Sequence, residues 1–445
     1  MNGFEFYPER SGPEYTTLED WILNESIPFS PGSPGIFNIT VKRVIGSLSP
    51  AVELLGFGEA LHGGEEILLL RNRLFRQLVQ KHGYSAIALE SSFPRAHVVN
   101  EYVNGRGPVS YDEIRESGFS HGFGRLRANR ELVEWMREYN ADPTHTTKLR
   151  FYGFDSPTEM TGSDSPRQLL QFVLGYLASV DGADNNDRRD RIESLIGEDA
   201  PWENPAAMMD PEESIGLSPA ATALRIETED LITELATRRP GLVAETGNDR
   251  FHEAVQYASV ARQLLDYHAL LAQKMPTGER IMNGLGRRDA MMADNLAYAV
   301  ARERGRGKVF AFAHNSHLQR GPARWQPGKY ALTWWPAGAH LREILGPGYA
   351  VIGSAVGISG ANGIAGPEAG TPEALLTAVP GPARFIPTWD GRGLPAPEIA
   401  ALPVRSGSRK NPTYFALTPQ SISDFDWLAV LDETGYADGG PLLPG

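Results

Sequence analysis

A short glycine-bounded turn with two titratable side chains constrains this chain most. The segment Gly58–Gly64 reads GEALHGG and carries Glu59 and His62. The apolar run 52–57 before it is typical of a buried strand, and apolar residues at helical spacing follow from Ile67 to Val79. The turn therefore joins a strand to a helix, which is where ligands bind in open α/β sheets. A carboxylate and an imidazole there can accept protons and orient each other.

Three further apolar runs lead to a polar group in the same way. They are Ser85–Glu90, Leu149–Asp155 and the run 308–313, which is followed by His314. One such residue would most simply cap a helix or pair with an arginine. Four strands that each deliver a titratable group, counting the strand before Glu59, instead predict a polar cleft at one edge of a sheet.

The middle of the chain changes character, because strand-like runs disappear and long amphipathic patterns dominate from 163 to 304. We expect an α/β fold with a mostly parallel central sheet flanked by helices, and a largely helical insertion or subdomain. The expected parts are an N-terminal arm and helix at 1–50, the first part of the α/β core at 51–162, the helical subdomain at 163–304 and the second part of the core at 305–445.

Several local signals can be checked against a structure. Thr16 or Thr17 is the expected cap of a first helix, and Gly83 is the expected end of the helix after the turn. The Pro/Gly-rich stretch 28–35 predicts a loop, as does the polar stretch 184–190. Residues 357–412 predict loops with one short helix near 372–376.

Composition narrows the class of partner. The chain has 445 residues, a net charge of −13 and no cysteine. The negative charge argues against a nucleic-acid partner, and the missing thiols exclude disulfides and cysteine nucleophiles. The longest apolar stretch, near 169–180, is too short to span a bilayer, and the first residues do not resemble a signal peptide. We expect a cytoplasmic protein that acts on a small molecule, with no membrane partner.

A metal site is one interpretation of the histidines near the fourth strand. His314 and His317 are three residues apart and would face the same way on a helical turn. Together with Glu59, His62 and Glu90 they offer ligands that a metal could accept. The spacing does not match the His-Glu-x-x-His pattern of zinc enzymes. Residue chemistry alone leaves this alternative open.

Other catalytic patterns are absent. No Gly-x-Ser-x-Gly segment marks a serine nucleophile, since Gly353–Gly357 lacks the pattern and lies in a predicted strand. The glycine pairs at 122–124 and 284–286 do not follow strands, so they are not dinucleotide-binding fingerprints. We expect the remaining single histidines to be ordinary helix or loop residues; these are His97, His121 and His268.

An ordered set of motifs, spanning about residues 52–432, resembles the erythromycin esterase family. Besides the turn 58–63 with Glu66 and Arg71, the matching segments are Ile87–Glu90, Trp135–Asn140, Phe151–Asp155, Arg288–Asp289 with Met292 and Asn295, Ala313–His317, Gly338–Leu341 and Phe425–Asp426. The resemblance implies an enzyme that hydrolyses the lactone ester of macrolide antibiotics, and hence antibiotic resistance, without a metal or cofactor.

The resemblance also implies roles for individual residues. The catalytic set that it carries over is Glu59, His62, Arg71, Glu90 and His314. The residues expected to bind substrate are Glu66, Asp155, Arg288, Asp289, Asn315 and His317. In the implied mechanism His62 is the general base on a water molecule, and the glutamates orient His62 or the water. His314 and Arg71 would assist the substrate carbonyl or the oxyanion.

The turn departs from the family pattern at Ala60 and Leu61, where small hydroxyl residues are typical. The leading hypothesis is a metal-independent hydrolase of a carboxylic ester or macrolactone. The second is a biosynthetic tailoring enzyme that uses the same His/Glu site for acyl transfer, elimination or cyclisation of a polyketide-like natural product. The third is a binding protein whose site has decayed.

Overall fold

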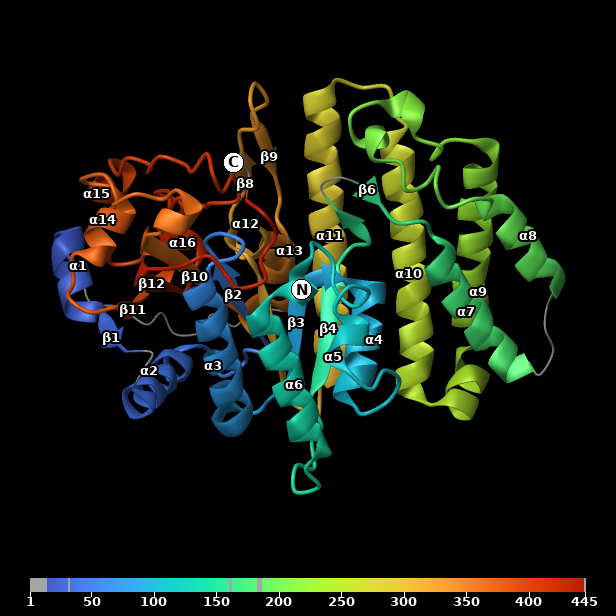
Figure 1. The fold of residues 1–445 in the computed structure, drawn as a ribbon, viewed down its shortest axis with the longest axis horizontal. Coiled ribbons are helices and arrows are strands. Elements are labelled where there is room, and N and C mark those ends of the chain that lie inside the picture. The colour runs from blue at the N-terminus through green and yellow to red at the C-terminus, as the bar shows by residue number, and fades with distance from the viewer. Residues whose placement is uncertain (1–13, 31–32, 160–161, 182–185, 444–445) are drawn as a thin grey trace, which may run out of the picture. The chain divides into compact units, whose positions relative to one another are not determined.

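The computed structural model describes residues 14–30, 33–159, 162–181 and 186–443 (Figure 1). Its main sheet has eight strands in the order β1-β11-β12-β10-β2-β7-β3-β4. Their bounds are β1 Ile27–Phe29, β2 Leu54–Glu59, β3 Tyr84–Ser92, β4 Arg150–Asp155, β7 Lys308–His314, β10 Tyr349–Ile358, β11 Ala383–Pro387 and β12 Trp427–Glu433. The pairs β2–β10, β10–β12 and β3–β4 are parallel, whereas β11 runs antiparallel to β1 and β12. The mostly parallel α/β fold predicted from the sequence is confirmed.

The chain forms two compact units. The first comprises Met1–Gly83, Phe312–Gly321 and Pro347–Gly445, and the second Tyr84–Ala311 and Pro322–Gly346. The division of the sequence into four parts stays a prediction.

In the first unit, helices surround β1, β2, β10, β11 and β12. They are α1 Leu18–Glu25, α2 Pro34–Ser47, α3 Glu65–His82, α12 Asn315–Leu318, α14 Pro372–Thr377, α15 Ala396–Ala400 and α16 Ser421–Asp424. Thr17 caps α1 by accepting a hydrogen bond from the Asp20 amide, and Gly83 ends α3 in the left-handed region with φ 73°. Both local predictions are confirmed. A Cβ atom at Gly58 would overlap the Asn315 side chain, so the turn requires glycine there.

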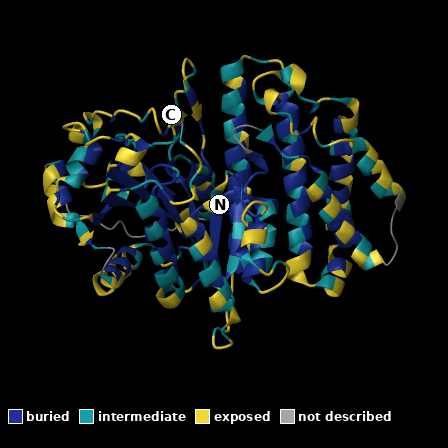
Figure 2. Cartoon of the chain, in the orientation of Figure 1, coloured by how far each residue is buried: buried dark blue, intermediate teal, exposed yellow. Residues whose placement is uncertain are grey.

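In the second unit, long helices pack beside β3 and β4. The helices are α4 Phe93–Val103, α5 Tyr111–Ile114, α6 Arg127–Ala141, α7 Arg167–Asp181, α8 Asn186–Ile196, α9 Pro219–Thr246, α10 Asn248–Leu271, α11 Thr277–Glu303 and α13 Ala337–Leu345. Two small hairpins, β5 Thr158–Glu159 with β6 Gly162–Ser163 and β8 Ala323–Trp325 with β9 Leu332–Trp334, complete it. Helix α10 packs against α7, α9 and α11, and α11 packs on β4. Strand β3 is buried along its whole length and is dark blue in Figure 2, whereas the helices carry exposed residues. The predicted helical region is confirmed.

Some local predictions were wrong. The stretch 28–35 is not one loop, because Pro28 lies in β1 and Pro34 opens α2, where its fixed φ suits the first turn. Residues 186–190 begin α8 rather than a loop, while 184–185 lie outside the described residues. The region 357–412 contains α14 as expected, but also β11 and α15. Residues 1–13 of the expected N-terminal arm and helix at 1–50 lie outside the described residues. None of the described helices is long and apolar enough to cross a membrane.

The approach of α4 to β4 gives a stability prediction. A Cβ atom added at Gly153 would lie 2.5 Å from the Ser91 oxygen and 2.7 Å from the Ala96 Cβ. Gly153→Ala should therefore lower the free energy of unfolding by about 1–3 kcal/mol through overpacking. Gly175→Ala in α7 is the control, because its new methyl group would meet nothing within 4 Å and should be neutral or stabilising. Denaturant unfolding measures both; equal stability of the two variants would contradict the packing argument.

Candidate functional site

The first unit brings together what we call the histidine cluster, namely Glu59, His62, His314 and Thr413. Glu59 is the last residue of β2 and His314 the last of β7, and His62 lies on the turn after β2. The His62 and His314 rings lie 5.1 Å apart between centroids, tilted by 56°. The two strand ends therefore place two imidazoles side by side, as their positions in the sequence predicted.

Glu59 orients the His62 ring. The distance from His62 Nδ1 to Glu59 Oε1 is 2.6 Å. Since an ionised carboxylate can only accept, we assign the proton of the neutral imidazole to Nδ1 and the basic lone pair to Nε2. The Glu59 side chain is 4% exposed, whereas that of His62 is 29% exposed. A buried acid thus holds a base that a ligand can reach.

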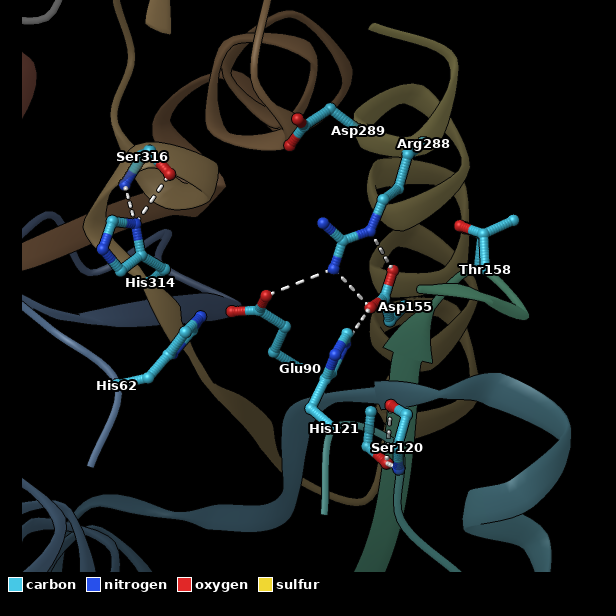
Figure 3. Close-up of polar contacts among 12 residues, drawn as sticks. His62, Glu90, Ser120, His121, Asp155, Thr158, Arg288, Asp289, His314 and Ser316 are labelled. Atoms are coloured by element: carbon cyan, nitrogen blue, oxygen red, sulfur yellow. Dashed lines mark hydrogen bonds and ion pairs between the residues drawn. The ribbon is translucent and has the colours of Figure 1, made fainter. Parts of the chain in front are cut away.

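His314 is held at both ring nitrogens. Its Nε2 lies 2.7 Å from the main-chain oxygen of Thr413. Its Nδ1 lies 2.7 Å from Ser316 Oγ, and this contact is drawn in Figure 3. The Ser316 amide also donates to Nδ1 over 3.3 Å. Because a carbonyl oxygen only accepts and an amide only donates, we assign the neutral tautomer with its proton on Nε2.

Two other predicted residues on α3 anchor local structure. Arg71 is buried, donates from Nε and Nη2 to Asn72 Oδ1, and lies 4.8 Å above the Phe312 ring. The Glu66 carboxylate accepts from the Gly435 amide at 2.6 Å.

Asn315 and His317 lie on α12, immediately after His314. The Asn315 side chain pairs with both main-chain groups of Ser354 in β10, at 2.8 and 3.1 Å. The ring of His317 lies 6.4 Å from that of His314. The substrate-binding roles expected for these residues stay predictions.

The second unit contains what we call the arginine cluster, namely Glu90, His121, Asp155 and Arg288. Arg288, from α11, donates from Nε to Asp155 Oδ1 at 2.9 Å and from Nη2 to Asp155 Oδ2 at 2.6 Å. Its Nη2 also lies 3.3 Å from Glu90 Oε1, and His121 Nε2 lies 3.1 Å from Asp155 Oδ2 (Figure 3). One guanidinium therefore links a carboxylate near the end of β3 with the carboxylate at the end of β4.

The electrostatics of this cluster favour an ion network. Burial acts to raise the pKa of Asp155, but the charge of Arg288 and hydrogen bonds from His121 and Arg288 leave it below its usual value. Burial acts to lower the pKa of Arg288, but Asp155 and Glu90 raise it overall. Glu90, His121 and Asp155 also offer ligand atoms within 4.8 Å of one another, as a metal would need. The guanidinium already supplies the positive charge there, so these residues fit an arginine better than a metal ion.

The position of Glu90 differs from the prediction. Strand β3 continues two residues beyond it to Ser92, and the pairing of β3 with β4 shifts register between Leu89 and Ser92. Bulges of this kind redirect side chains and are frequent beside active sites. Asp155 ends β4 as predicted.

His121 is the member of the arginine cluster that sequence reasoning missed. Its φ is 58°, in the left-handed region that residues other than glycine adopt uncommonly. Such strain costs about 1–3 kcal/mol and is frequent at functional sites. Its partner Asp155 is 34 residues away, so no periodicity could reveal the pair.

The other residues singled out lie elsewhere in the second unit. Asp289 accepts from Trp334 Nε1 at 2.6 Å and from the Ala337 amide at 2.9 Å, at the start of α13. Burial lowers the pKa of His268 to about 4, and its Nε2 lies 3.0 Å from the Asp164 main-chain oxygen. His97 contacts Glu253. The single cleft expected from all four strand ends stays a prediction.

With this geometry established, comparison with known proteins gives the class. The sequence model of the family described as erythromycin esterase matches residues 79–434, which is most of the chain. The chain therefore belongs to the erythromycin esterase family. The match begins after the turn that carries Glu59 and His62.

Individual relatives agree with this assignment. The Escherichia coli erythromycin esterase type II is 24% identical over 340 residues, covering 76% of each chain. A solved structure of a Bacillus cereus protein has a TM-score of 0.71 at 19% identity, covering 95% of this chain and 98% of that one. A mutant erythromycin esterase in an open conformation has a TM-score of 0.62 at 19% identity, covering 91% and 95%. At these identities the structural matches establish the fold alone.

The arginine cluster gives a prediction about pH and stability. Asp155→Asn removes a buried charge from Arg288 and should cost about 3 kcal/mol of unfolding free energy at pH 7. The pKa of Asp155 is lower in the folded state than its usual value of 3.8. Its charge therefore stabilises the fold above about pH 4, and this contribution is lost as the pH falls below that value.

Urea unfolding at pH 7 and pH 3 measures the difference from wild type, which should shrink at pH 3. Asp266→Asn is the matched control, because it breaks a surface ion pair with Arg225 and should cost less than about 1 kcal/mol. A cost for Asp155→Asn that is equally small at pH 7 would contradict a buried ion network.

Proposed function

We propose that this protein hydrolyses a carboxylic ester or macrolactone, with His62 as the general base that activates water. The observation that carries the proposal is the 2.6 Å contact between His62 Nδ1 and the buried Glu59 carboxylate. A base held by a carboxylate at one nitrogen presents its lone pair at the other, as ester hydrolysis requires. Membership of the erythromycin esterase family supports this class of reaction.

The proposed steps balance without a further reactant. His62 Nε2 takes a proton from water while the water oxygen attacks the ester carbonyl carbon. The resulting imidazolium is stabilised by Glu59, and it returns the proton to the leaving alkoxide as the C–O bond breaks. The products are an acid and an alcohol, which remain in one opened molecule when the substrate is a lactone.

Other residues have supporting roles in this proposal. The resemblance gives Arg71 and His314 the task of assisting the substrate carbonyl or the oxyanion. The catalytic role that the resemblance gives Glu90, which lies in the arginine cluster of the second unit, stays a prediction. No metal or cofactor is needed in these steps, since the base is oriented by a carboxylate.

The names of the relatives suggest erythromycin or a similar macrolide as the substrate. The role in antibiotic resistance is what the resemblance implies. The departure at Ala60 and Leu61 bears on this, because both side chains are fully buried. Buried apolar side chains at these positions offer a ligand no hydroxyl group, while the His62 side chain is 29% exposed. The turn differs from the family pattern while the base His62 is kept. This combination favours a second candidate, namely a tailoring enzyme that catalyses acyl transfer, elimination or cyclisation of a natural product.

The proposal predicts the behaviour of a His62 variant. His62→Asn keeps a polar side chain of similar size but removes the proton acceptor. Turnover of erythromycin, or of the simple ester that the wild type cleaves best, should fall by about 10²–10⁴-fold. The melting temperature should stay within a few degrees of wild type, because the Glu59 carboxylate can still accept from the amide.

His252→Asn, on the partly exposed side of α10, is the matched control and should retain wild-type turnover. A second control treats the wild type with EDTA before the assay, which should leave the rate unchanged. Near-native turnover by His62→Asn would remove His62 as the base.

A further inference from the structure

A short segment far along the chain contacts both histidines of the histidine cluster. We call residues 411–415 the clamp segment; it lies in the first unit, between α15 and α16. Thr413 accepts a hydrogen bond from the His62 amide at its Oγ1, over 3.0 Å. The main-chain oxygen of the same residue accepts from His314 Nε2, over 2.7 Å. One threonine therefore bonds to the main chain of one histidine and to the ring of the other.

Asn411 sets the direction of these bonds. Its Oδ1 accepts from the Thr413 hydroxyl at 2.6 Å and from the Thr413 amide at 3.1 Å. The hydroxyl proton is thus directed to Asn411, which leaves an oxygen lone pair to accept from the His62 amide. The Asn411 Nδ2 donates to the His62 main-chain oxygen over 3.1 Å. Both main-chain groups of His62 are consequently bonded by this one pair of side chains.

The clamp segment is itself firmly anchored. The Phe415 amide donates to the Ala60 main-chain oxygen at 2.7 Å, and its ring meets the His314 ring edge-on at 5.9 Å. The Tyr414 hydroxyl donates to the buried carboxylate of Glu373 over 3.3 Å and accepts from Arg405 over 3.0 Å. An anchored segment can hold the catalytic turn in one conformation, which a loosely attached loop could not.

We propose that Asn411 and Thr413 are positioning residues, which hold the His62 main chain in place and keep His314 in its Nε2-protonated tautomer. This inference rests on the proposed function, because it assigns the clamp segment to the same reaction. A shift of about 1 Å in a catalytic group can cost a hundredfold in rate. If the clamp segment were purely structural, removing these side-chain bonds would lower the stability of the protein but leave its kcat unchanged.

The kinetic test uses the full-length protein and the ester that the wild type cleaves best. Thr413→Val keeps the shape of the side chain and removes the hydroxyl, so kcat should fall about 10–100-fold with KM within about twofold. Asn411→Asp replaces the donor to the His62 oxygen with an acceptor and should have a similar effect. Thr413→Ser, which keeps the hydroxyl, should restore most of the lost kcat.

Thr388→Val is the matched control. Thr388 is fully buried in the same unit and donates its hydroxyl to the Phe425 main-chain oxygen, without a contact to either histidine. Thr388→Val should have a lower melting temperature than the wild type but the same kcat. It separates the loss of a buried hydroxyl bond from the loss of a positioning contact.

The second readout does not depend on activity. In protein labelled with ¹⁵N-histidine, the His62 and His314 ring signals, assigned with His62→Asn and His314→Asn, should show one tautomer each in the wild type. Thr413→Val keeps the main-chain oxygen that accepts from His314, but it loses the hydroxyl bonds to the His62 amide and to Asn411 that hold this oxygen in place, so the His314 signals should report a mixture of tautomers. If His62→Asn kept its turnover while Thr413→Val changed the His314 ring signals, the proposed function would fail. The role of the clamp segment in positioning His314 would still be supported. Wild-type kcat in both Thr413→Val and Asn411→Asp, or unchanged ring signals, would overturn the inference.

Discussion

Glu59 ends a strand in which all six residues are buried, and its carboxylate therefore needs donors from the protein itself. His62 supplies one, because the chain turns at once and brings the imidazole back over the strand end. Gly63, with φ 77°, then allows α3 to begin, since a larger residue would be strained in that conformation. The need to satisfy a desolvated acid thus determines the conformation of the turn, the orientation of the imidazole and the side from which a ligand can reach it.

The arginine cluster also contains a buried carboxylate, but here an arginine supplies the hydrogen-bond donors. Asp155 is fully buried and lies in bidentate contact with Arg288 from the long helix α11. The guanidinium geometry matches a carboxylate and leaves further N–H groups for Glu90. His121 contributes a contact from a strained backbone conformation. A site that retains both strain and buried charge is typical of function rather than of stability alone.

The sequence predicted those features that depend on neighbours along the chain. Short continuous apolar runs predicted the buried strands, and the three-residue spacing of Glu59 and His62 made their contact foreseeable. The clamp segment could not be foreseen, because Thr413 is 351 residues from His62 and holds His314 through a main-chain oxygen. A main-chain contact leaves no side-chain pattern. The bulge at Glu90 and the conformation of His121 likewise depend on packing between distant segments, which periodicity does not encode.

The central claim is that water is the acyl acceptor of the reaction. Single-turnover reaction in H₂¹⁸O tests this most directly, with the ester or macrolactone that the protein consumes and mass analysis of the acid formed. The account predicts one ¹⁸O atom in the new carboxylate and none in the alcohol. An unlabelled product would contradict hydrolysis and would instead favour transfer, elimination or cyclisation at the same site.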